Sequence, residues 1–272
     1  LAYRPRKSAG GNCSVLGSIR LKRSWEWSAM GKHPAVMDYF QLGCSAPLAS
    51  AFAVWIENGY QKLVSKNRIR PAFCSWRFWA KGTRKGYIAC GLGRDSSDSA
   101  GRPYPLMILG IGTLAGWEKG WDLLPLVFAE TWRQIEYITS GHFADLTQLE
   151  TDIGRIKLPS RDWSAFAERR LKDDKNENRA EVNMMSQRHR EIEKGAKALL
   201  TTNELFVSID ADQGCDSLTM AWLWLCLLKS RINIVPNAVF LCGVPEKTYL
   251  AIFNRSLNYC DFVRLWSFST AY

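Results

Sequence analysis

The segment 91–106 constrains the fold most, because it places a polar loop between two apolar runs. These runs, residues 86–90 and 106–114, are predicted to be buried strands, so both ends of the loop should be anchored in a core. The loop should interrupt both strands and hold a defined shape. That shape is expected from prolines that lack an amide donor and from glycines that permit positive φ: Pro103, Pro105, Gly91, Gly93 and Gly101.

Four side chains of this loop are candidates for binding a protein partner: Arg94, Asp95, Arg102 and Tyr104. A guanidinium forms bidentate hydrogen bonds to carboxylate or phosphate, so Arg94 and Arg102 are expected to bind an acidic or phosphorylated surface. The alternative is structural. Arg102 could instead fold back onto Asp95 or Asp98 and hold the loop together.

The charge of the chain is unevenly distributed. The net charge is +10, yet residues 1–35 carry seven Lys or Arg against one Glu, and residues 62–102 carry ten against two Asp. This distribution predicts a local positive face that includes the loop, and it argues against a uniformly basic nucleic-acid-binding protein. We therefore expect no nucleic-acid partner.

The cysteines and the apolar runs indicate a cytoplasmic protein. The eight cysteines contain no CxxC pair and lie mostly in apolar runs, so they are expected to be reduced and free of disulfides. The apolar stretch 218–228 is too short to cross a hydrocarbon layer of about 30 Å. Residues 1–25 do not have the features of a signal peptide. We expect no stable membrane insertion.

The chain is expected to form one domain with an appended tail. Residues 1–26 are predicted to be a basic, irregular extension, and residues 27–272 a single α/β domain. Fully apolar strand-like runs predict a central mixed β-sheet flanked by helices on both faces. Local patterns predict helices over 47–66, 121–138, 143–156, 217–230 and 246–257, and strands over 72–80, 205–209 and 238–242. Residues 165–197 are rich in charge and contain few large apolar residues, so they are predicted to be exposed helix interrupted by a loop near residues 173–178.

The motifs for catalysis are incomplete. Gly91-x-Gly93 lacks the third glycine of a dinucleotide-binding loop. Asp210 and Asp212 follow a predicted strand and resemble the opening Asp-x-Asp motif of haloacid-dehalogenase-like phosphatases, although Gln213 stands where Thr or Val is usual. The chain contains no P-loop, and its histidines have no metal-ligand spacing (His33, His142, His189). We expect no catalytic residue, no cofactor and no metal.

Three segments resemble the sequence pattern of one family. Residues 31–40 read Gly-Lys-His-Pro-Ala-Val-Met-Asp-Tyr-Phe, similar to a Gly-Lys-x-Pro-x-x-Gly-Asp-Phe motif with Met37 in place of glycine. Residues 94–106 begin Arg-Asp-Ser and end Gly-Arg-Pro-Tyr-Pro-Leu, similar to an Asp-Ser/Arg-x-Gly-Arg-x-Phe-Pro-Leu signature with extra residues inside it. Residues 236–266 match more weakly. Together these segments resemble the TagF proteins of bacterial type VI secretion. The resemblance covers residues 27–267 and assigns motif positions to Gly31, Lys32, Pro34, Asp38, Gly101 and Pro105.

The resemblance implies a regulator without enzymatic activity. TagF-like proteins are cytoplasmic α/β proteins that restrain assembly of the secretion apparatus after translation. Their circuits also contain a threonine kinase, a phosphatase and a forkhead-associated scaffold, so the scaffold is a possible partner here. The alternative is a small magnesium-dependent phosphatase that uses Asp210 and Asp212.

The first motif segment also carries an expectation from its residues alone. A Gly and a Pro flank a single acid before two aromatic residues, so residues 31–40 should form a structured entry to the domain. Asp38 is expected to cap a turn or helix, and Tyr39 and Phe40 are expected to be buried.

Overall fold

The computed structural model describes residues 25–43, 46–65, 74–141, 143–159, 163, 166, 181–209, 216–244 and 247–268. Strand β1 (Trp25–Gly31) begins inside the segment 1–26 that the sequence assigned to the extension. Residues 25 and 26 therefore belong to the sheet.

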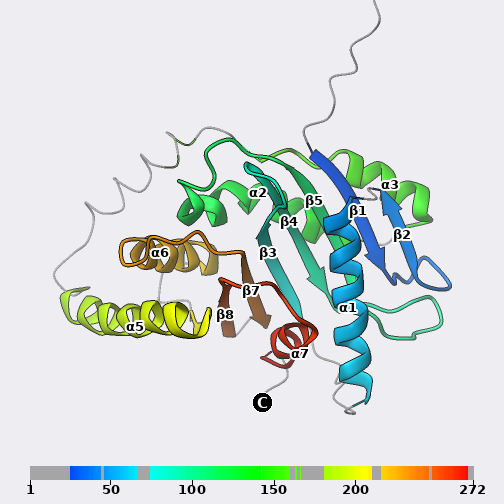
Figure 1. The fold of residues 1–272 in the computed structure, drawn as a ribbon. Helices are drawn as coiled ribbons and strands as arrows, with labels where there is room; N and C mark the ends of the chain where they lie inside the picture. The colour runs from blue at the N-terminus through cyan, green and yellow to red at the C-terminus, as the bar shows by residue number, and fades with distance from the viewer. Residues whose placement is uncertain are drawn as a thin grey trace, which may run out of the picture.

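One eight-stranded sheet forms the centre of the described part of the chain (Figure 1). Its order is β2-β1-β5-β4-β3-β7-β8-β6, and all neighbouring strands pair antiparallel. The α/β class is confirmed, whereas the expected mixture of parallel and antiparallel strands is corrected to an antiparallel sheet. The remaining strands are β2 (Phe40–Gly43), β3 (Ser75–Lys81), β4 (Tyr87–Arg94), β5 (Leu106–Thr113), β6 (Glu204–Ser208), β7 (Ala238–Val244) and β8 (Lys247–Phe253).

Helices cover both faces of the sheet, as predicted. Helices α1 (Pro47–Ser65) and α7 (Tyr259–Phe268) pack together on one face, over an aromatic core that includes Trp76, Phe78 and Phe240. The opposite face carries α2 (Leu124–Ser140), α3 (Leu146–Gly154), α5 (Glu181–Thr202) and α6 (Ser217–Lys229), with the short 3-10 helix η1 (Trp121–Leu123) before α2. Each buried strand residue therefore packs against one of the two helical layers, according to the face of the sheet on which its side chain lies.

The segment 246–257 is the main correction to the predicted elements. Residues predicted to be a helix form strand β8, which pairs with β7 on one side and β6 on the other. The physical reason is a period of two: Leu250 and Ile252 enter the core under α2 and α6, whereas Ala251 and Phe253 enter the core under α1. Because β7 ends at Val244 and β8 begins at Lys247, the connection is short and the two strands form an antiparallel hairpin.

Strand β4 also runs further than predicted. Residues 91–94, placed in the loop by the sequence, continue the strand and pair with β3 and β5. Gly93 is required here because a Cβ would lie 2.1 Å from the Trp76 ring, and at Gly91 it would lie 2.8 Å from the Phe78 ring. The two glycines therefore make room for aromatic side chains of β3. The loop itself begins at Asp95.

Two findings bear on the cysteines and on the apolar runs. The cysteines it describes are free: Cys74, Cys90, Cys226, Cys242 and Cys260. None of the described helices is long and apolar enough to span a membrane.

Candidate protein-binding site

The loop 95–105 folds back against the first motif segment, residues 31–40. An isolated β-bridge between Ser97 and Pro103 closes the loop on itself. The Ser99 amide then donates a 2.8 Å hydrogen bond to the Val36 carbonyl, which ties the loop to the first segment. The two segments with the strongest TagF-like pattern, 63 residues apart at their starts in the sequence, thus form one structural unit.

The Asp98 carboxylate lies at the centre of this unit. It is buried, and its oxygens accept hydrogen bonds from the amides of Ala100 (3.0 Å) and Arg102 (2.9 Å). It also accepts from Arg102 Nε at 2.7 Å and from Lys32 Nζ at 2.9 Å. Asp98 thereby holds its own loop closed and binds the first motif segment through Lys32.

The charge of Asp98 is stabilised by these contacts. Burial by itself would raise the pKa of this carboxyl, but the hydrogen bonds from Lys32 and Arg102 outweigh burial and lower the pKa to about 2. The carboxylate is therefore ionised at any physiological pH. A buried carboxylate is costly unless it is hydrogen-bonded, so Asp98 holds the donor groups around it in place.

Arg102 holds the loop and also reaches the surface. Besides Asp98, its guanidinium donates to the Met37 carbonyl at 2.5 Å and lies 3.8 Å from Asp38. The fold-back contact to Asp98 that the sequence left open is thus present, and the one to Asp95 is not among the described contacts. The Arg102 side chain is nevertheless 55% exposed, so part of the guanidinium faces solvent.

The motif positions assigned by the resemblance fall in or beside this unit. Gly31 has φ +128°, and a Cβ there would lie 2.0 Å from the Pro105 carbonyl oxygen, so the two motif segments touch at this glycine. Gly101 has φ +76° in the turn after Asp98. Pro34 lies in an exposed turn, and Asp38 accepts a 2.7 Å hydrogen bond from the Tyr39 amide.

The outer side of this unit carries the exposed side chains of Met37, Tyr39 and Arg102 beside the half-buried Tyr104; we call these four residues the Met37 surface. Met37 is 80% exposed and Tyr39 is 43% exposed, so the predicted burial of Tyr39 is wrong, whereas that of Phe40 is confirmed. The reason is that β2 begins only at Phe40, which leaves Tyr39 outside the sheet. No local pattern indicated that Met37 would be exposed.

Tyr104 fixes the Met37 surface to helix α1. Its hydroxyl donates a 2.6 Å hydrogen bond to Glu57, and its ring packs edge-on against Tyr39 and Tyr60. The Tyr60 hydroxyl donates a 2.8 Å hydrogen bond to the Pro103 carbonyl. Burial, followed by the contact with Glu57, raises the pKa of Tyr104 well above its usual value. The surface is therefore held in place before any partner binds.

Arg94 and Asp95 lie on the other face of the sheet. Arg94, at the end of β4, donates a 2.6 Å hydrogen bond to the Ser140 hydroxyl at the end of α2. The Asp95 amide donates to the Cys74 carbonyl, and burial raises the pKa of the Asp95 carboxyl despite the neighbouring Arg94. Both residues line a pocket of about 460 Å³ with Arg77 and Glu136. The structure therefore separates Arg94 and Asp95 from Arg102 and Tyr104.

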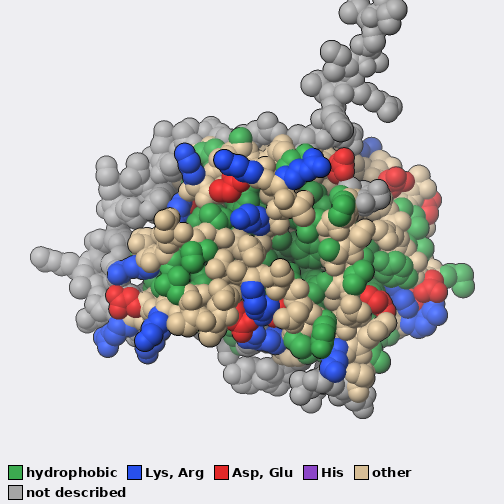
Figure 2. Space-filling model, in the orientation of Figure 1, with side chains coloured by type: hydrophobic (Ala, Val, Ile, Leu, Met, Phe, Trp, Pro, Cys, Tyr) green, Lys and Arg blue, Asp and Glu red, His purple; other side chains and the backbone are tan. Residues whose placement is uncertain are grey.

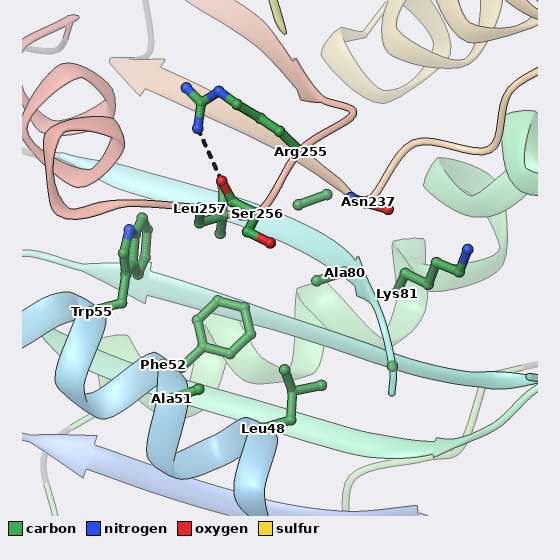
Figure 3. Close-up of a pocket in the computed structure, with 12 residues that line it drawn as sticks. Leu48, Ala51, Phe52, Trp55, Ala80, Lys81, Asn237, Arg255, Ser256 and Leu257 are labelled. Carbon is green, nitrogen blue, oxygen red and sulfur yellow. Dashed lines mark hydrogen bonds between the residues drawn. The ribbon is translucent and has the colours of Figure 1, made fainter. Parts of the chain in front are cut away.

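A further pocket, of about 400 Å³, lies between α1 and the ends of β3 and β7 (Figure 3). Its wall is mostly apolar, with Phe52 and Trp55 from α1 and Leu257 from the loop after β8. The Arg255 guanidinium at its edge points to the Ser256 carbonyl, and it also forms an ion pair with the buried Asp261. No residue singled out by the sequence lines this pocket.

The structure does not test the expected positive face, because its six basic residues before residue 25 and those at 66, 68 and 70 lie outside the described part of the chain. On the side drawn in Figure 2, the described acidic and basic side chains are interspersed. Asp210, Asp212 and His142 lie outside the described residues. His33 is buried, and its Nδ1 accepts a hydrogen bond from the Ala35 amide. Within the part of the chain that the structure describes, no three His, Cys, Asp or Glu residues are placed to hold a metal ion.

Comparisons with known proteins give little beyond this geometry. No family model matches the chain, and no curated protein matches it. A solved structure, that of PA0076 from Pseudomonas aeruginosa PAO1, aligns over 49% of this chain and 64% of its own, with 19% identity and a TM-score of 0.36. The alignment thus covers less than two thirds of that protein.

Proposed function

We propose that this protein is a cytoplasmic, non-enzymatic regulator that restrains type VI secretion by binding a protein partner through the Met37 surface. The partner we propose is the forkhead-associated scaffold of the secretion circuit. The proposal starts from the TagF-like pattern in residues 31–40 and 94–106.

One observation carries the proposal: the two motif segments meet around the buried Asp98. Lys32 from the first segment and Arg102 from the second both bind this carboxylate. If each motif segment only stabilised its own turn, side chains from the two segments would not need to contact the same carboxylate. Here they build one joint unit, and its outer side is the Met37 surface.

The composition of the Met37 surface suits a protein interface. Met, Tyr and Arg are enriched at the centres of such interfaces, and Met37 is among the most exposed apolar side chains that the structure describes. Arg102 and Tyr104 are already held by Asp98 and Glu57, so binding would cost little side-chain entropy.

The test is calorimetric titration of the intact chain with the purified forkhead-associated scaffold of the same bacterium. Met37→Asp should weaken binding by at least tenfold, because it places a charge in an apolar contact, while the melting temperature stays within about 1 °C of the parent. Leu200→Asp is the matched control, since Leu200 is 53% exposed on α5. Equal affinities of the two variants would refute the proposal. In cells, Met37→Asp should also release assembly of the fluorescently labelled contractile sheath.

A further inference from the structure

We propose that a groove centred on Arg94 binds an extended peptide of a protein partner, with an oxyanion side chain of that peptide on the Arg94 guanidinium. The oxyanion is a carboxylate or a phosphate. The inference rests on the proposed function in one respect only, that the chain acts by binding proteins, and it concerns a different surface.

Arg94 has no ion-pair partner among the residues that the structure describes. Within the described residues, its guanidinium has a neutral hydrogen-bond acceptor, the Ser140 hydroxyl, and no carboxylate oxygen within 4.0 Å. The other arginine of the same pocket, Arg77, is paired with Glu136 at 2.7 Å. The fork of Arg94 is thus available to an external oxyanion, and bidentate binding is the geometry that such a fork favours.

The pocket around Arg94 offers further donors for an oxyanion. Hydroxyl groups line it from three separate elements: Ser75 of β3, Ser217 of α6 and Thr248 of β8. Asp95 is the opposing feature, because its carboxylate would repel an anion at Arg94. Removal of the Asp95 charge should therefore raise the affinity for an anionic peptide, which makes the proposal testable.

The pocket continues into a second hollow that suits the rest of a peptide. Ser140 lines both the Arg94 pocket and a groove of about 660 Å³ between α2 and α3. The groove is lined by the apolar side chains of Ile138, Phe143 and Ile156, and by Tyr137, which is 81% exposed. Arg155 at its edge is paired with Asp152. A cationic anchor beside a groove that offers both apolar and polar side chains fits a chain of several residues better than a small anion.

The groove and the Met37 surface lie on opposite faces of the sheet. Arg94 bonds to α2, whereas Tyr104 bonds to α1. Because α1 and α2 cover different faces, substitutions at one surface should leave the other unchanged. Failure of one proposal can therefore be told from failure of the other.

The probes are three pools of fluorescein-labelled nonapeptides with degenerate flanks and phosphothreonine, glutamate or threonine at the centre, measured by fluorescence anisotropy with the full chain. The phosphothreonine or glutamate pool should bind at least tenfold more tightly than the threonine pool, and less tightly as salt rises. A phosphothreonine preference assigns a phosphorylated partner, and equal binding of the two anionic pools assigns an acidic one.

Four variants complete the test. Arg94→Gln should lower the affinity for the two anionic pools to that for the threonine pool. Arg94→Lys should also lower the affinity for the anionic pools, although the positive charge is kept. Asp95→Asn should strengthen binding severalfold, a gain that a merely structural role would not give. Arg84→Gln, at an exposed arginine in the turn between β3 and β4, is the control and should leave all pools unchanged. Absence of binding by every pool, equal binding of all three, or unchanged binding by Arg94→Gln and Arg94→Lys would overturn the proposal.

Discussion

Gly31 offers a sharp test of the contact between the two motif segments. It pairs with Leu106 across β1 and β5, and its φ of +128° lies where L side chains rarely occur. A Cβ at this position would lie 2.0 Å from the Pro105 carbonyl oxygen and 2.9 Å from the Leu106 Cα. Both obstacles are backbone atoms, so no side chain can rotate away to relieve the clash.

The structure sets the expected cost of Gly31→Ala. A non-glycine residue in a rarely populated backbone region costs about 1–3 kcal/mol. Forcing an extra carbon into a packed site adds about 1–3 kcal/mol. The free energy of unfolding should therefore fall by about 3 kcal/mol or more. Gly101→Ala is the matched control: φ is +76° and a Cβ would meet nothing within 4 Å, so about 1 kcal/mol is expected.

Urea unfolding followed by far-ultraviolet circular dichroism measures both costs. With a slope on the order of 3 kcal/mol/M, the midpoint of Gly31→Ala should lie about 0.7 M or more below that of Gly101→Ala. Equal midpoints would show that β1 and the end of the loop do not approach as closely as the structure places them.

Local signals predicted some elements well. Asp216 caps α6 as its position before an apolar run indicated, since its carboxylate accepts from the amides of Leu218 and Thr219. Helix α1 begins at Pro47, which suits a first helical turn. Such features depend on residues within one turn of each other, and the sequence displays those directly.

Strand β8 shows why other elements escaped prediction. The seven residues of β8 are rich in apolar side chains, a pattern that is compatible with a helix or with a strand. They form a strand because they pair with β6, which lies more than forty residues earlier in the sequence. Gly93 is a similar case. Its position inside β4 is explained only by the Trp76 ring of the neighbouring strand, which no local pattern reveals.

The same limit applies to the candidate site. The sequence identified Arg102 and both of its possible roles, but the choice between Asp95 and Asp98 required the closed loop. Lys32, 66 residues before Asp98, could be tied to that carboxylate only in three dimensions. Arg94 and Arg102 lie close in sequence and were expected to act together, yet the alternation of side chains along β4 directs Arg94 toward α2.

Three further predictions concern burial, the alternative function and pH. Phe40→Ala should lower the free energy of unfolding by about 3 kcal/mol, because Phe40 is 6% exposed; an unchanged urea midpoint would contradict its placement. Millimolar Mg²⁺ should leave the melting temperature unchanged; a rise that Asp210→Asn abolishes would favour the phosphatase alternative. Burial raises the pKa of Tyr60 to about 12, and that of Tyr104 is raised as well. Because the folded state favours the neutral phenols, their contribution to stability is complete below pH 10 and is lost as pH rises through 10 toward 12. Difference absorbance near 295 nm should thus show these two tyrosines ionising last, together with loss of the fold, and the Tyr60→Phe Tyr104→Phe double variant should lose less stability than the parent between pH 10 and 12. An equal loss in the parent and the double variant would show that these hydroxyls are not held as the contacts with Pro103 and Glu57 require.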